Sequence, residues 1–112
     1  MKLICAVVKP FKVIELVDAF RNEKGFPGMT VLQGEGFGRR PVPLRSPTED
    51  LRDFTPHSMI LVAAPMAQVS AITDLIARIA HTGQPGDGKL FVLPLEAAIA
   101  LTRGERGEAA LS

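Results

Sequence analysis

Apolar residues follow two different patterns in the first third of the chain, a continuous run and then a helical spacing. Residues 3–8 form an unbroken apolar run rich in β-branched side chains, which predicts a buried strand. Lys9-Pro10 ends this run, and apolar side chains then recur at helical spacing, at Val13, Leu16, Val17 and Phe20. Gly28 closes the helical segment, and residues 29–33 read as a second strand.

The second half of the chain repeats this order. Residues 59–64 predict a strand, Pro65 opens a helix, Gly83 ends it, and residues 90–95 predict a further strand. The apolar face of this helix consists of Val69, Ile72, Ile76 and Ile79. The proline that opens the helix and the glycine that follows it lie 18 residues apart in both halves.

This repeated β-α-β pattern predicts an α+β fold, the ferredoxin-like βαββαβ sandwich, with both helices on one face of the sheet. The predicted strands are apolar on both sides, although helices cover only one of them. We therefore expect the other face to be buried against further copies of the chain in a homo-oligomer.

Residues 39–56 interrupt the repeat. They contain four prolines, four arginines and few large apolar side chains, so they cannot contribute to a core. Long connections within compact domains are often functional, and we expect a flexible recognition loop here, with a passive linker as the alternative. Residues 96–100 predict a helical turn or a short last strand, and residues 102–112 a polar C-terminal tail.

Length and composition suit a single domain over residues 1–112. The net charge of +1 gives no general basis for binding nucleic acid or an anionic membrane. The single cysteine, Cys5, cannot form an internal disulfide and is expected to be a small buried apolar residue, which favours a reducing, cytoplasmic setting. No stretch predicts a signal peptide or a membrane span.

Residues 83–90 nearly match the phosphate-binding pattern G-x-x-x-x-G-K-[ST]. Leu90 replaces the hydroxyl residue that would hold Mg²⁺, and the apolar residues that follow predict a strand where a phosphate-binding loop opens a helix. The chain is therefore not expected to be a P-loop ATPase. Glycine backbone can still approach a ligand closely, and Lys89 can place a charge on phosphate; a tight turn into a strand is the alternative.

Five short motifs follow one another around the central segment: Lys9-Pro10-Phe11-Lys12, Gly28-Met29-Thr30-Val31, Gly36-Phe37-Gly38-Arg39, Thr82-Gly83 and Gly86-Asp87-Gly88-Lys89. In this combination the chain closely resembles the PII signal-transduction proteins over nearly its whole length. The resemblance implies a homotrimer of ferredoxin-like subunits with their sheets packed inward. It also implies adenine nucleotide in the clefts between subunits and a flexible T-loop, here residues 39–56, that contacts target proteins.

The resemblance also implies a nucleotide-binding set, which in this sequence is Thr30, Gly36, Gly38, Arg39, Gly86, Asp87, Gly88 and Lys89. Glycine amides and the lysine would meet phosphate, the arginine would add a charge-assisted contact, and the threonine would offer its hydroxyl to base or ribose. From the residues alone, a β-bulge or a plain strand position explains the threonine and the first two glycines equally.

Several positions depart from the usual pattern of this family. Two arginines that clamp the triphosphate are replaced by Ala100 and Thr102, and losing two charge-assisted hydrogen bonds costs about two to four decades in affinity. Neighbouring strand residues point to opposite faces, so Arg103 can compensate only if the strand has already ended. We expect ADP or AMP to bind at least as well as ATP.

Two further departures weaken the expected response to Mg²⁺ and 2-oxoglutarate. Arg40 replaces a glutamine that helps to coordinate the metal, and His57 replaces a lysine that assists the oxo-acid. His81, near the end of the second helix, is expected to be a surface residue that favours the helix dipole.

The T-loop is shorter than is usual in the family, and the chain has no tyrosine that could be uridylylated. We expect its mixed charges and hydroxyls to contact the partner protein, through Arg40, Arg45, Ser46, Glu49 and Arg52. The resemblance predicts a non-enzymatic regulator of a transporter or metabolic enzyme. The alternatives are slow nucleotide hydrolysis, with Asp87 or His57 orienting water, and a metal-binding trimer of the divalent-cation-tolerance type.

Overall fold

The computed structural model describes residues 1–37 and 54–112. Along the chain the elements are β1 (Lys2–Val8), α1 (Lys12–Arg21), β2 (Thr30–Phe37), β3 (Phe54–Ala64), α2 (Met66–Ala80), β4 (Gly88–Pro94) and the 3₁₀ helix η2 (Gly107–Leu111). This order confirms the predicted βαββαβ fold. The four strands form one sheet in the order β2-β3-β1-β4, with every neighbouring pair antiparallel.

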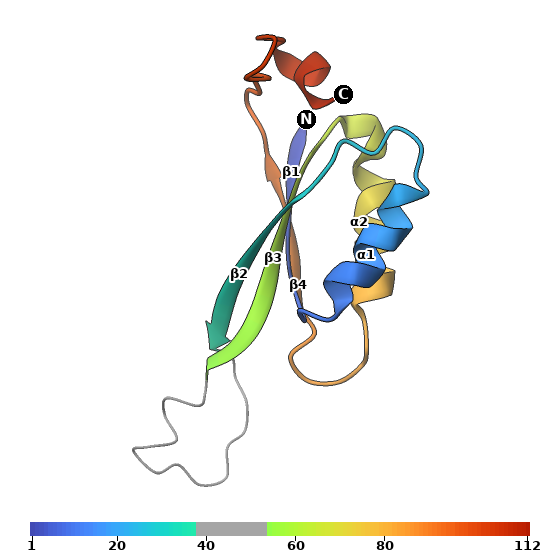
Figure 1. Cartoon of the computed structure of the whole chain (residues 1–112), viewed down its shortest axis with the longest axis vertical. Coiled ribbons are helices and arrows are strands. Elements are labelled where there is room, and N and C mark those ends of the chain that lie inside the picture. Colours follow the sequence, from blue (N-terminus) through green and yellow to red (C-terminus); the bar gives the residue numbers. More distant parts are fainter. Residues whose placement is uncertain (38–53) are drawn as a thin grey trace, which may run out of the picture.

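Both helices lie on one side of the sheet (Figure 1). Alternate residues of β1 point toward them, so Ile4, Ala6 and Val8 are at most 2% exposed. These side chains pack in one apolar core with buried residues of β3, α1 and α2, which are Ile60, Val62, Ala64, Leu16, Phe20, Ile72, Ile76 and Ala80. The core therefore follows the predicted strand and helix periods.

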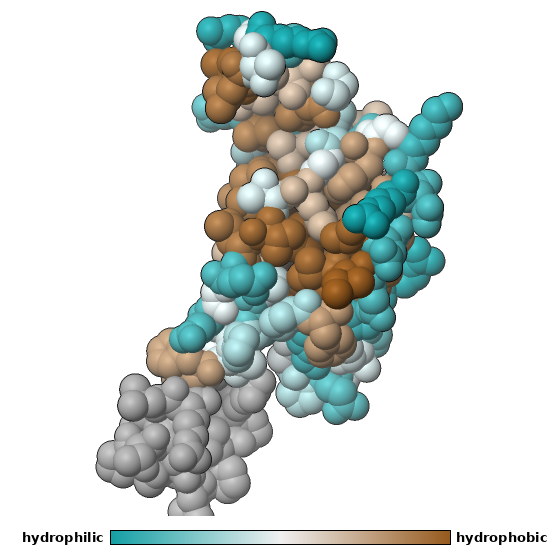
Figure 2. All heavy atoms as spheres, viewed as in Figure 1, coloured by the Kyte–Doolittle hydropathy of each residue, from teal (hydrophilic) through white to brown (hydrophobic). Residues whose placement is uncertain are grey.

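The opposite side of the sheet carries a second set of apolar side chains, which we call the open face. Its register pairs Cys5 with Leu61 on one side and Phe91 on the other, and Leu3 with Leu93. Phe91 and Leu93 are 50% and 44% exposed. In the described part of the chain no helix covers this face, and apolar side chains gather across the middle of the molecule in Figure 2. The prediction of a buried Cys5 is wrong in detail, because this residue points to the open face and is only partly buried.

The β2–β3 hairpin is longer than its apolar pattern predicts. Residues 34–37 of β2 pair with residues 57–54 of β3, so the end of the expected recognition loop, residues 54–56, belongs to a strand. The hairpin extends past the helices (Figure 1), and side chains there need not alternate between apolar and polar. Residues 38–53, which hold the rest of that loop, lie outside the described residues.

The C-terminal segment folds back on itself, where the sequence predicts a polar tail. Ile99 forms an isolated antiparallel bridge with Arg106, and the Ala100 amide donates to the Glu105 carbonyl at 2.8 Å. The η2 helix follows directly. Residues 101–103 form the intervening turn, so the strand has ended before Arg103 and the alternation of strand faces does not apply to it.

Gly88 is required where β4 begins. Its φ is +104°, and a Cβ built on it would lie 1.7 Å from the Val7 carbonyl oxygen. Gly88→Ala therefore combines backbone strain with a clash against a central strand, and we expect it to lower the free energy of unfolding by at least about 3 kcal/mol. Urea denaturation measures this loss.

Gly34→Ala is the matched control. Gly34 lies in β2 with no atom within 4 Å of its built Cβ, so its substitution should change the free energy of unfolding by less than about 0.5 kcal/mol. Equal losses in the two variants would contradict the specific role of Gly88.

Candidate functional site

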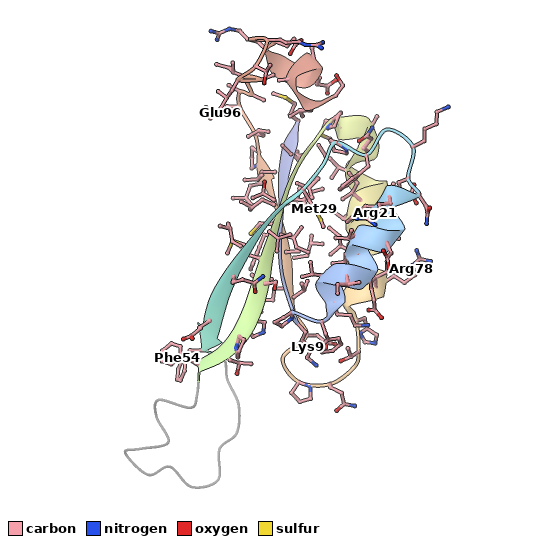
Figure 3. The ribbon with its side chains drawn as sticks, in the orientation of Figure 1. Lys9, Arg21, Met29, Phe54, Arg78 and Glu96 are labelled. Carbon is pink, nitrogen blue, oxygen red and sulfur yellow. The ribbon has the colours of Figure 1, made fainter. Side chains whose placement is uncertain are left out.

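The glycine-rich segment predicted as a ligand loop connects α2 to β4. The α2 helix ends at Ala80, and β4 begins at Gly88, so the loop covers residues 81–87. It lies at the same end of the molecule as the turn between β1 and α1, beside Lys9 (Figure 3). A hollow of about 220 Å³ adjoins it, lined by loop residues, by β1 and β4, and by the last turns of α2.

The Asp87 carboxylate is the centre of this loop. Its Oδ2 accepts hydrogen bonds from the backbone amides of Thr82 and Gly83, at 2.7 Å and 2.9 Å. The Thr82 hydroxyl donates to Oδ1 and itself accepts the Gln84 amide at 3.1 Å. One carboxylate and one hydroxyl thus hold the amides of three consecutive residues, which defines the shape of the loop.

Lys9 joins this network from the end of β1. Its ammonium lies 3.0 Å from Asp87 Oδ1 and donates to the Thr82 hydroxyl at 3.2 Å. The Lys9 side chain is only 19% exposed, so the ion pair is largely shielded from water. The contact ties the first βα turn to the loop after α2.

These donors hold the pKa of the Asp87 carboxyl well below its usual range. The Thr82 hydroxyl contributes most and the Thr82 amide next, and the Lys9 ammonium and the Gly83 amide act in the same direction against the opposing effect of desolvation. His81 Nδ1 lies 3.9 Å from Oδ2 on an exposed side chain, which is a weaker contact. His81 is therefore an exposed residue at the end of α2, as predicted.

His57 connects the loop to the β2–β3 hairpin. Its Nε2 lies 3.2 Å from the Gly86 carbonyl oxygen, and its Nδ1 lies 3.1 Å from the Thr55 carbonyl oxygen. The imidazole sits directly over Gly36, where a built Cβ would lie 2.8 Å from Nδ1. A residue larger than glycine at position 36 would displace the imidazole. The contacts of His57 therefore bring two predicted ligand positions, Gly36 and Gly86, close together, and a third, Asp87, follows Gly86 in the chain.

The remaining predicted residues are distributed over the chain. Lys89 is exposed in β4 opposite Val7, whereas Thr30 is exposed at the start of β2, about 20 Å along that strand from Gly36. Arg103 lies in the C-terminal turn, beyond the end of β4 opposite to the glycine loop (Figure 1). Within one chain, Thr30 and Arg103 are not brought to the loop.

Seven of the predicted contact positions lie outside the described residues. They are the ligand positions Gly38 and Arg39 and the partner-binding positions Arg40, Arg45, Ser46, Glu49 and Arg52.

The two side chains considered for catalysis, Asp87 and His57, already have partners within the protein. Both Asp87 oxygens accept hydrogen bonds from the protein, and both His57 nitrogens face backbone carbonyls. Among the described residues, no group of three or more His, Cys, Asp or Glu side chains could hold a metal ion. Within the same residues, no helix is long and apolar enough to cross a membrane.

The sequence motifs alone do not identify Lys9 and Thr82 as anchors of the loop. Each occurs in one of the motifs, but 73 residues separate them along the chain. A lysine before a proline is also explained as the end of a strand. Only the ion pair with Asp87 shows that the Lys9 charge holds the loop.

Asp87→Asn tests this network through pH. Because folding lowers the pKa of Asp87, the ionised carboxylate stabilises the folded state fully above about pH 5, and this contribution is lost as pH falls below about 4. We expect the variant to unfold at lower urea concentration than the parent at pH 7, with a difference that shrinks in acid. Asp18→Asn, at an exposed carboxyl on α1, is the control and should show no such trend. A difference that is independent of pH down to pH 2 would contradict the role of the charge.

Comparison with known proteins identifies the family to which this sequence belongs. Residues 1–105 match the sequence profile described as "Nitrogen regulatory protein P-II". The chain is 39% identical over 109 residues to "Nitrogen regulatory protein P-II" of Azospirillum brasilense, with 96% of each protein covered. It is 37% identical to "Nitrogen regulatory protein GlnK" of Escherichia coli K12, with 99% of this chain and 100% of the relative covered. A P-II protein of Rhodospirillum rubrum is 40% identical over 109 residues. The chain therefore belongs to the nitrogen regulatory protein P-II family of signal-transduction regulators.

Proposed function

We propose that this chain is a non-enzymatic, cytoplasmic signal transducer that assembles as a homotrimer and binds adenine nucleotide beside its glycine loop. In this proposal the nucleotide controls a transporter or a metabolic enzyme through residues 39–56. The observation that carries it is the glycine loop, held in one conformation by Asp87, Thr82 and Lys9 with Lys89 exposed next to it.

The glycine loop offers suitable chemistry for a polyphosphate. The Asp87 carboxylate is neutralised by Lys9 and by amide donors, so its charge does not oppose an incoming anion. The Lys89 ammonium has no ion pair among the described residues and can make a charge-assisted contact with phosphate. Glycine at 86 and 88 lets a ligand approach the backbone closely.

Assembly through the open face would complete the site. Leu32 and Met59, which are paired in register, are 48% and 36% exposed, and they add to Phe91 and Leu93 of the same face. Extended apolar surface of this kind marks a protein interface. Since Thr30 and Arg103 do not reach the glycine loop within one chain, a second subunit is needed to bring them there.

Nucleotide preference follows from the C-terminal turn. Ala100 and Thr102 carry no charge, so the triphosphate loses two charge-assisted contacts that the family pattern provides. Arg103 lies in a turn, so the alternation of strand faces does not fix the direction of its side chain. This arrangement supports binding of ADP and AMP at least as well as ATP.

The response to 2-oxoglutarate is proposed to be weak. His57 replaces the lysine of the family pattern, and both of its nitrogens already face carbonyl oxygens of Thr55 and Gly86. An oxo-acid would have to break these contacts to use the imidazole. For regulation, the nucleotide must bind more tightly to one arrangement of residues 39–56 than to another, since only differential affinity shifts a population.

Calorimetric titration with ATP, ADP and AMP, each with and without Mg²⁺ and 2-oxoglutarate, tests the ligand. We expect ADP or AMP to bind about as tightly as ATP or more tightly, with no effect of 2-oxoglutarate. Lys89→Ala should weaken nucleotide binding about 10- to 100-fold, because it removes a charge-assisted hydrogen bond.

Lys2→Ala is the matched control for Lys89→Ala, since Lys2 lies at the other end of β1. It should bind nucleotide as the parent does. Undetectable binding of all three nucleotides to the parent protein would refute the ligand assignment. Tight ATP binding that 2-oxoglutarate strengthens would refute the predicted selectivity.

The assembly is tested by sedimentation of the parent and two variants. We expect the parent to sediment at three times the 12.0 kDa mass of one chain. Leu93→Asp places a charge in the open face and should lower this mass, because burying an unpaired carboxylate is costly. Ile14→Asp, at a 70% exposed position on α1, should leave the mass unchanged. Sedimentation of the parent protein as a monomer would contradict the proposed trimer.

A further inference from the structure

A groove between the two helices lies on the side of the molecule away from the open face. It runs between the C-terminal end of α1 and the first three turns of α2 and has a volume of about 390 Å³. This volume falls in the range of small-ligand sites, about 300 to 1,000 Å³. The groove involves none of the residues assigned to the nucleotide or to the trimer, so it requires an explanation of its own.

Two features of the sequence create this groove. Ala67 and Ala71 lie one turn apart on α2, and their side chains are too short to fill the space toward α1. The Phe20 and Phe26 rings stack at 4.1 Å between centroids, 3° from parallel, and form an apolar wall. Phe20 is 3% exposed, so this wall is anchored in the core.

Gln68 presents an unsatisfied acceptor at the groove. Its Nε2 donates to the Gly25 carbonyl at 3.1 Å, which orients the amide. Its Oε1 is shielded from solvent and has no hydrogen-bond partner, the one such side-chain atom in residues 1–37 and 54–112. A buried acceptor without a donor is costly. Because solvent does not reach Oε1, a donor group of a bound molecule would satisfy it only after the Gln68 side chain shifts toward the groove.

Charges of both signs surround the groove. Glu23 and Lys24 come from the segment after α1, and Asp74 and Arg78 from α2. None of these four forms an ion pair with another described residue, although Asp74 and Arg78 are one turn apart on the same helix. Their charges therefore remain available to a ligand.

Together these features select the chemistry of the ligand. An apolar side chain fits the phenylalanine wall, and an ammonium group can pair with Glu23 or Asp74 of the rim, or donate to Gln68 Oε1 once that side chain shifts. A carboxylate can pair with Lys24 or Arg78. A purely anionic ligand would face Glu23 and Asp74, and a purely cationic one would face the two basic side chains. We propose that the groove binds a zwitterionic ligand of the amino-acid class, with an apolar side chain.

The length of the groove separates two sources of this chemistry. Gln68 and Arg78 are ten residues apart, or about 15 Å along α2. Lys24 precedes Gly25, whose carbonyl accepts a hydrogen bond from Gln68. The carboxylate of a free amino acid bound at the Gln68 end of the groove therefore lies near Lys24 and far from Arg78. A peptide of four residues spans about 14 Å when extended and can reach Arg78.

Titration of the ¹⁵N-labelled protein tests the site with defined probes: L-phenylalanine, an apolar tetrapeptide with free ends, and the same tetrapeptide acetylated or amidated. We expect saturable shifts at the α1–α2 groove with a free-ended probe. We expect affinity to fall at least tenfold when either end of the tetrapeptide is blocked. Equal binding of the blocked peptides, or no saturation by any probe at millimolar concentration, would overturn the proposal.

Paired variants locate the ligand and identify its source. Ala71→Met fills the groove with a good helix former and should weaken binding at least tenfold, whereas Ser70→Met, on the same helix outside the groove, should not. Arg78→Ala should weaken only the tetrapeptide, with Arg21→Ala as the control on α1 (Figure 3). Binding that survives Ala71→Met in a folded protein would refute the site. These readouts involve neither nucleotide nor assembly, so they can fail independently of the proposed function.

Discussion

Burial of one face of the sheet under α1 and α2 is the interaction on which the rest of the structure depends. The β1 strand lies between β3 and β4, and its inward residues are almost inaccessible to solvent. Because strand side chains alternate, the same strand sends Leu3, Cys5 and Val7 to the other side. Two helices cannot cover both faces of a four-stranded sheet. The fold therefore creates the open face as a direct consequence of its own core.

The same packing positions the glycine loop. The β1 strand and α2 end at the same edge of the molecule, so Lys9 and the residues after His81 meet there. The Asp87 carboxylate gathers amide, hydroxyl and ammonium donors, and it gives a segment rich in glycine a defined shape. Rigid glycine backbone is useful for ligand binding only when something other than side-chain bulk holds it. In this chain an internal ion pair and five hydrogen bonds supply that support.

The β2–β3 hairpin carries the connection between the glycine loop and residues 38–53. Its outer half lies beyond the helices, and its contact with the loop passes through His57 over Gly36. Glycine at 36 makes room for an imidazole that touches carbonyls of both elements. The ring at position 57 thus forms part of the scaffold.

Apolar patterns in the sequence predicted the strands and helices of both halves, because burial imposes a period of 3.6 on helices and produces continuous apolar runs in strands that are buried on both faces. They failed where side chains are not fully buried: in residues 54–57 and 34–37, which pair with one another beyond the helices, and in the C-terminal turn with η2. Cys5 was misplaced because an apolar run does not say which of its residues face the helices.

The motifs by themselves determined the family and named the glycine loop. Only the tertiary structure decided what holds that loop, since the Lys9–Asp87 ion pair joins residues far apart in sequence and depends on where β1 and α2 end. The groove beside Phe20 and Gln68 was likewise invisible in the sequence. Local patterns determine where the elements lie and which face of each helix is buried, whereas the buried face of an apolar strand and the gaps and contacts between elements depend on how they pack.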